Sequence, residues 1–118
     1  MRGKTEWTIA DGFMSDSKSG DYVSHEAVCV LNLTDSDAEV RISVYFEDRD
    51  PMTGFTARCG SKRTNHIRLD KIKNDKGETI PKELPYALLI ESSVPVICQH
   101  SRMDVSTSDM TLMTTMAY

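Results

Sequence analysis

A hydrophobic period of two residues recurs along most of this chain and limits its possible folds more than any other feature. Between residues 40 and 46, Val, Ile, Val and Phe alternate with more polar neighbours. Residues 66–69 and residues 5–10, where Trp7 and Ile9 share one face, show the same alternation. Successive side chains of a β-strand point to opposite faces of the sheet, so this period predicts strands with one face in the core.

Two further segments, residues 27–31 and 86–90, are apolar at every position. Such runs are typical of strands that are covered on both faces. In one small sandwich only the inner face of each sheet meets the core, so we expect another copy of the chain to cover the outer face. The sequence therefore predicts a homo-oligomer.

Turn-forming residues separate the predicted strands. Pro51 follows the strand at 40–46, and residues 92–95 (Ser-Ser-Val-Pro) are expected to separate a strand at 86–90 from one at 96–102. Residues 71–84 form the longest irregular stretch. About eight strands at spacings of roughly 8–15 residues are typical of an antiparallel sandwich or barrel. We predict an all-β fold, a small antiparallel β-sandwich, with residues 1–118 as its single domain.

The secondary structure of the C-terminal segment is ambiguous between a strand and a short helix. Met110, Met113 and Met116 recur every three residues, a spacing that fits a helix. The threonines between them favour a strand, and the segment is short. We predict a strand whose methionines fill the core.

Charge and cysteine content limit the class of function. The 118 residues carry a net charge of −4, which argues against non-specific nucleic-acid binding, since that needs clustered Lys and Arg. No apolar run is long enough to span a bilayer, and the N-terminal residues do not resemble a signal peptide. Cys29, Cys59 and Cys98 are an odd, widely spaced set, which fits reduced thiols in a cytoplasmic protein.

Three histidines, His25, His66 and His100, fall on three different predicted strands, each beside other polar residues. Alternation places His100 and Arg102 on one face together with two apolar residues. Buried polar groups must be paired. These residues therefore form a structural network, a site for a small polar ligand, or a metal site of the kind that cupin barrels carry.

The motif search favours binding over catalysis. No close-spaced histidine pair supports a metal site, and the sequence has no dinucleotide, P-loop, zincin or hydrolase motif. We therefore expect no metal, no cofactor and no enzymatic activity. A metal-dependent cupin-like enzyme and a purely structural oligomeric adaptor are the alternatives.

Six segments resemble the sensory rhodopsin transducer family, in order and over nearly the whole chain. They are residues 7–13 (WTIADGF), 24–32 (SHEAVCVLN), 45–48 (YFED) with Pro51, 63–68 (RTNHIR), 94–104 (VPVICQHSRMD) and 112–118 (LMTTMAY). The resemblance implies a small antiparallel β-sandwich that assembles as a homotetramer. It also implies a soluble cytoplasmic protein, since the family's namesake is such a partner of a membrane photoreceptor. For other relatives a role in binding small, sugar-like molecules is the general proposal.

From the residues and the resemblance together we expect a non-enzymatic signalling or ligand-binding module that is cytoplasmic and homotetrameric. Its ligand is expected to be small and polar, because arginine forks suit carboxylate, phosphate or vicinal hydroxyls. Its partner is expected to be a membrane receptor or a downstream signalling protein. The candidate ligand-binding residues are the polar positions of the matching segments: His25, Glu26, Asn32, Arg63, His66, Arg68, Gln99, His100 and Arg102.

Overall fold

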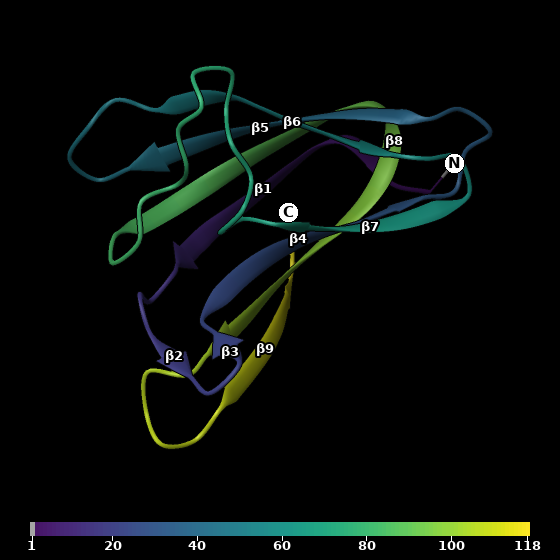
Figure 1. Ribbon diagram of the computed structural model, residues 1–118. Coiled ribbons are helices and arrows are strands. Elements are labelled where there is room, and N and C mark those ends of the chain that lie inside the picture. The colour runs from purple at the N-terminus through teal and green to yellow at the C-terminus, as the bar shows by residue number, and fades with distance from the viewer. Residues whose placement is uncertain (1) are drawn as a thin grey trace.

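The computed structural model describes residues 2–118, which form strands and connecting loops and no helix (Figure 1). The strands are β1 (Lys4–Phe13), β2 (Lys18–Ser19), β3 (Tyr22–Val23), β4 (His25–Asn32), β5 (Ala38–Phe46), β6 (Met52–Cys59), β7 (Arg63–Arg68), β8 (Pro85–Asp104) and β9 (Thr111–Met116). Every strand pairing is antiparallel. Accordingly, the described residues include no helix with the length and apolar character needed to cross a membrane.

The 20-residue strand β8 runs through both layers of the fold (Figure 1). Its first half pairs with β5 and β1, and its second half pairs with β4 and β9. We call the layer β6-β5-β8-β1 sheet I and the layer β7-β4-β8-β9 sheet II. The two layers curl around one core, which confirms the predicted all-β class and small antiparallel sandwich.

The predicted break at residues 92–95 is wrong, because β8 continues through them. Pro95 has no backbone N–H, so it cannot donate a hydrogen bond to a neighbouring strand. It stands where β8 exchanges β5 for β4 as its neighbour: Ser92 is paired with Val40 and Ile97 with Leu31, while Lys4 of β1 is paired with Val96. The strand therefore changes partners at this point without a turn.

The remaining predictions of secondary structure are confirmed for β5 and for the irregular segment at 71–84, but not for the loop after β1. Alternation along β5 is confirmed, since Val40, Ile42 and Val44 are buried and pack in the core with Phe55. The segment at 71–84 is irregular apart from one isolated bridge between Lys73 and Thr79. The polar loop after β1, in contrast, contains the short β2-β3 hairpin that the sequence did not indicate.

The C-terminal segment is a strand, as predicted, but its methionines do not fill the core. All six residues of β9 are exposed, and so is Met110 before it. The chain end is held instead through its backbone, because the N–H of Tyr118 donates to the carbonyl of Thr8 at 2.9 Å. This contact joins β1 of sheet I to the segment after β9.

Candidate functional site

A fully buried carboxylate, Glu26 on β4, accepts hydrogen bonds from four donors, three on β8 and one on β1. Nε of Arg102 lies 2.5 Å from Oε2, and Nε2 of His100 lies 3.0 Å from Oε1. The phenol of Tyr86 donates to Oε1, and the backbone N–H of Phe13 donates to Oε2 at 3.0 Å. We call Glu26, these three side chains and the Phe13 N–H the Glu26 network.

Strand alternation builds most of this network. Glu26 pairs with Arg102 across the β4-β8 ladder, and both residues point to the inner face of sheet II, as does His100. Tyr86 comes from the opposite end of β8 and reaches Glu26 because β8 curls from one layer into the other. Gly12 allows this approach, since a Cβ there would lie 2.4 Å from the Tyr86 ring.

The network favours the charged form of Glu26. Burial acts to raise the pKa of this carboxyl, but the hydrogen bonds from His100, Tyr86, Phe13 and Arg102 outweigh it and hold the pKa below the usual 4.5. Burial also acts to lower the pKa of Arg102, yet the contact with Glu26 leaves that pKa raised. Burial, followed by the Glu26 charge, raises the pKa of Tyr86. The centre is therefore an ion pair beside a neutral phenol.

Acid should weaken the fold through Glu26. Its pKa is lower in the folded state, so its contribution is complete above about pH 4.5 and is lost as the pH falls through the folded value. We expect wild-type stability to fall more steeply than that of Glu26→Gln below about pH 4.5. Urea unfolding from pH 7 to pH 3 measures both slopes, and parallel slopes would contradict the assignment.

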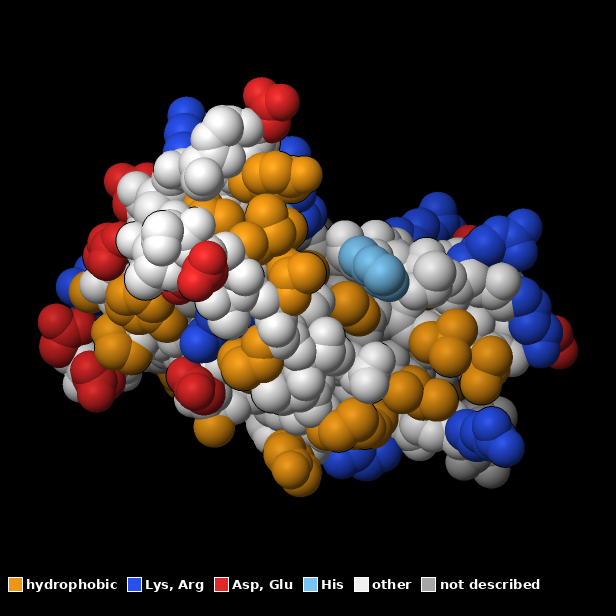
Figure 2. Space-filling model, turned by 90° about the horizontal axis from the view of Figure 1, so that it is seen from below, with side chains coloured by type: hydrophobic (Ala, Val, Ile, Leu, Met, Phe, Trp, Pro, Cys, Tyr) orange, Lys and Arg blue, Asp and Glu red, His pale blue; other side chains and the backbone are white. Residues whose placement is uncertain are grey.

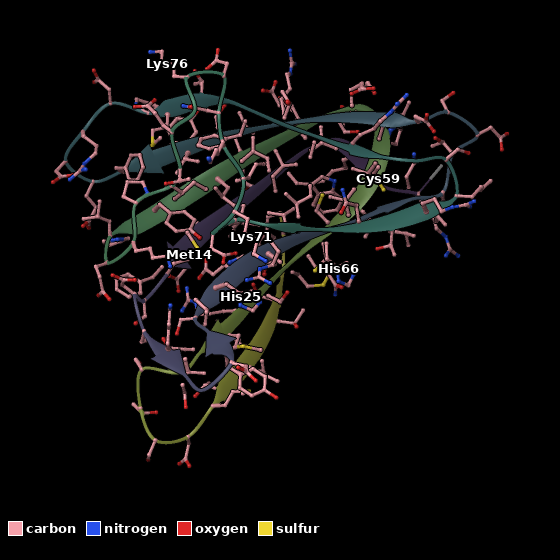
Figure 3. The ribbon with its side chains drawn as sticks, in the orientation of Figure 1. Met14, His25, Cys59, His66, Lys71 and Lys76 are labelled. Carbon is pink, nitrogen blue, oxygen red and sulfur yellow. The ribbon has the colours of Figure 1, made fainter. Side chains whose placement is uncertain are left out.

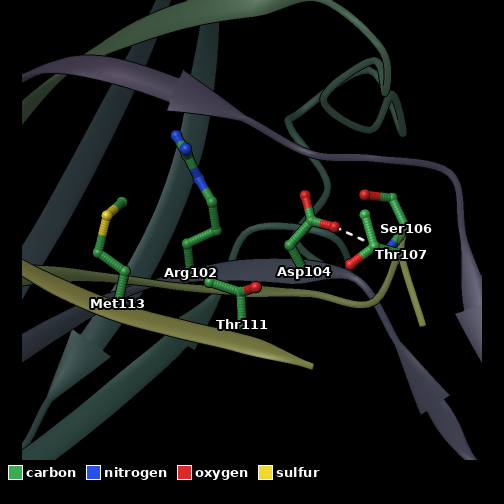
Figure 4. A pocket seen from close by; sticks show the side chains of 6 residues that line it. All are labelled: Arg102, Asp104, Ser106, Thr107, Thr111 and Met113. Carbon is green, nitrogen blue, oxygen red and sulfur yellow. Dashed lines mark hydrogen bonds between the residues drawn. The ribbon is translucent and has the colours of Figure 1, made fainter. Parts of the chain in front are cut away.

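An open hollow of about 280 Å³ lies next to the network, on the solvent side of Arg102. Its lining residues are Arg102, Asp104, Ser106, Thr107, Thr111 and Met113 (Figure 4). Nη2 of Arg102 lies 3.4 Å from the Asp11 carbonyl oxygen, while Nη1 has no hydrogen-bond partner within residues 2–118. We call this space the Arg102 hollow; one cation, one carboxylate and three hydroxyls surround it.

The structure brings together three of the nine predicted site residues: Glu26, His100 and Arg102. Asn32 is buried elsewhere, where its amide donates to the Ser36 and Cys59 carbonyls and organises two turns. Arg68 forms a two-bond ion pair with Asp70, at 2.8 and 2.9 Å.

The remaining four predicted residues lie at the surface of sheet II or near it. His66 and Gln99 are exposed on its outer face, and His25 is half-buried there with Nδ1 2.8 Å from the Val23 carbonyl oxygen. Arg63 is exposed and donates to the Lys62 carbonyl oxygen. Figure 3 shows His25 and His66 on the underside of the sandwich, away from the core that holds Cys59.

Sequence reasoning missed Tyr86, the Phe13 N–H and the hydroxyl residues of the hollow. Tyr86 begins an apolar run, where an inward-facing phenol is a weak signal for a polar partner. Within residues 2–118, every buried side-chain nitrogen and oxygen has a hydrogen-bond partner, so the inner part of the network is satisfied. Within the same range, no three His, Cys, Asp or Glu side chains are grouped to hold a metal ion.

A family model and two solved structures match most or all of this chain. A family model described as Anabaena sensory rhodopsin transducer matches residues 2–118. Among solved structures, the crystal structure of Thermotoga maritima 1070 is similar with a TM-score of 0.90 and 40% identity, covering 100% of this chain and 96% of that one. The Anabaena sensory rhodopsin transducer is similar with a TM-score of 0.77 and 34% identity, covering 87% and 90%. None of the curated proteins matches the chain.

Proposed function

Because the chain belongs to the Anabaena sensory rhodopsin transducer family, we propose that it is a non-enzymatic signal-transducing module that works as a cytoplasmic homotetramer. Its partner is a membrane receptor or a downstream signalling protein, in keeping with a family named for transduction. The metal-dependent alternative is without a ligand set in residues 2–118.

The module binds a small hydroxyl-rich ligand, such as a sugar, in the Arg102 hollow. The observation that carries this proposal is the position of Arg102, which donates through Nε to buried Glu26 and also lines the hollow. A guanidinium fork suits two neighbouring hydroxyls or a carboxylate. Asp104 and the hydroxyls of Ser106 and Thr111 supply acceptors and donors for the rest of such a ligand.

Binding separates this function from that of a structural adaptor, which needs no ligand. We expect at least one member of a panel of monosaccharides, polyols and sugar acids to raise the melting temperature, because a ligand that binds the folded state stabilises it. If no member of the panel does so at millimolar concentration, the ligand part of the proposal fails and the adaptor alternative gains.

Thr111→Val should weaken binding of the best panel compound by about 3–10-fold, the loss of one neutral hydrogen bond. Valine matches threonine in shape and suits a strand, so the fold should be unchanged. Thr56→Val, on an exposed position of β6, is the matched control and should bind like wild type. Calorimetric titration measures all three chains, and equal affinities would place the ligand outside the hollow.

A further inference from the structure

Two edge strands of the sandwich, β1 and β9, lie on either side of a groove. Within residues 2–118 each of them pairs with β8 and with no other strand. The N–H of Tyr118 donates to the Thr8 carbonyl, and the N–H of Thr8 donates to the Tyr118 carbonyl. No ladder continues from this point through the described residues, and in Figure 1 the purple β1 and the yellow β9 run apart from it. The two edges therefore meet at one end of the groove and separate toward the other.

The space between these strands, which we call the β1–β9 groove, has a volume of about 340 Å³. Its two sides are formed by Ile9, Ala10 and Asp11 and by Met113, Thr115 and Met116. A β-bulge lies on the β1 side: Ile9 pairs with Leu88 and Gly12 with Tyr86, so two residues of β1 stand opposite one of β8. A bulge bends its strand and leaves the extra residue unpaired, and this one lies where the groove is open.

Both strands have backbone groups without a strand partner on the side away from β8. An antiparallel strand bonds to one neighbour through alternate residues, so the N–H and C=O groups of the residues between them point the other way. On β9, and on β1 beyond Thr8, no strand within residues 2–118 receives these groups. Such a row of donors and acceptors is a template for another extended segment.

The other two edge strands are protected from such pairing, whereas β9 is not. β6 and β7 end the path of strands on either side, and they carry one and two arginines, which oppose association at an edge. The six residues of β9 contain no charge, proline or glycine, and Leu112 is 67% exposed. Figure 2 shows hydrophobic side chains spread across the underside of the molecule, where Figure 1 places β9. The free edge of β9 is thus the one best suited to pairing.

The charges at the groove indicate which kind of segment fits it. Of the described residues that line it, Asp11 is a carboxylate with an 89% exposed side chain, and none is Lys or Arg. The neighbouring Arg102 is paired with Glu26 at 2.5 Å. The chain as a whole carries a net charge of −4, so it attracts a basic segment and repels an acidic one.

We propose that the β1–β9 groove binds an extended, basic segment of a partner protein as an added strand. The backbone of the segment pairs with the free edges, its alternate apolar side chains pack against Ile9 and Met113, and a Lys or Arg reaches Asp11. Cytoplasmic loops of membrane proteins are rich in Lys and Arg, so such a segment suits a membrane receptor. The inference rests on the proposed function and names the chemistry of its partner.

A synthetic probe tests the strand pairing. The probe is a fluorescein-labelled peptide, Lys-Val-Thr-Val-Lys-Val-Thr-Val-Lys, whose β-branched residues favour an extended backbone. One control peptide has methylated valine and threonine nitrogens, which removes most N–H donors but keeps the charge, and another has Glu in place of Lys. By fluorescence anisotropy we expect the probe to bind with a micromolar dissociation constant and each control to bind about tenfold or more weakly.

Hydrogen exchange shows where on the protein the probe binds. At saturating probe concentration we expect amide exchange in β9 to slow about tenfold or more, because edge amides without a strand partner become hydrogen-bonded. The edge strands β6 and β7 are the internal control, and their exchange should not change.

Asp11→Asn tests the charge preference. It should weaken binding of the lysine probe by about 2–5-fold, the value of one exposed ion pair. Asp50→Asn makes the same change in net charge at an exposed position before β6, and it should bind the probe like wild type. Equal losses in the two variants would show that net charge, and not the groove, attracts the probe.

The outcomes separate this inference from the proposed function. The groove proposal is overturned if the lysine probe does not bind at millimolar concentration, if the N-methylated peptide binds equally well, or if exchange slows in β6 or β7 and not in β9. Failure of the proposed function would instead appear as a mass of 13.3 kDa in light scattering or as no response to the sugar panel, and neither result depends on the peptide.

Discussion

Glu26→Ala is expected to lower the free energy of unfolding by about 3–5 kcal/mol, the range for breaking a buried ion pair by removing one partner. The substitution removes the acceptor of Arg102, His100, Tyr86 and the Phe13 N–H at once. Buried donors without acceptors keep their full desolvation cost, and the arginine charge is left uncompensated. For a chain of this length the melting temperature should fall by about 10–20 °C.

Glu39→Ala is the matched control. Glu39 also makes an ion pair, with Nε of Arg58 at 3.3 Å, but both side chains are 65% exposed. Exposed pairs contribute about 0–1 kcal/mol, so this variant should unfold close to wild type. Urea unfolding at pH 7 and one fixed chain concentration measures both variants. A Glu26→Ala chain as stable as Glu39→Ala would show that the network does not hold the sheets together.

The fold was largely predictable because strand alternation is a local signal. The pattern at Val40, Ile42 and Val44 depends only on one sheet having one buried face, and the structure confirms it. The continuity of β8 was not predictable, because Ser92 to Pro95 have the composition of a turn. Only the position of these residues between two sets of strand partners makes an unbroken strand possible there.

Part of the candidate site was predictable from strand parity, the rule that alternate residues of a strand share one face. Parity correctly places His100 and Arg102 on one inner face. The same rule separates His25 from Glu26, since neighbours along a strand point to opposite faces. The predicted ligand-binding set was therefore wrong to place both residues in one site. The role of Tyr86 could not be predicted for another reason. Its contact with Glu26, 60 positions away in the sequence, depends on the curl of β8, and no local sequence pattern encodes that curl.

The dual role assigned to Arg102 makes Arg102→Ala the variant with the second large effect. We expect a loss of about 3 kcal/mol, the lower end of the 3–5 kcal/mol range for a broken buried pair. The loss is smaller than for Glu26→Ala because Glu26 keeps three donors when Arg102 is absent. The arginine side chain is also 20% exposed, whereas that of Glu26 is fully buried.

A double-mutant cycle isolates the pair from the rest of the network. In the Glu26→Gln background, where the carboxylate charge is gone, Arg102→Ala should cost less than in wild type by about 1.5–3 kcal/mol, the value of a charge-assisted hydrogen bond. Arg58→Ala, which removes an exposed arginine that lies 2.9 Å from Asp37, should change stability little in either background. Additive effects of the Glu26 and Arg102 substitutions would show that Nε is not committed to the fold. Arg102 would then serve the hollow alone, and its role would be one of binding rather than structure.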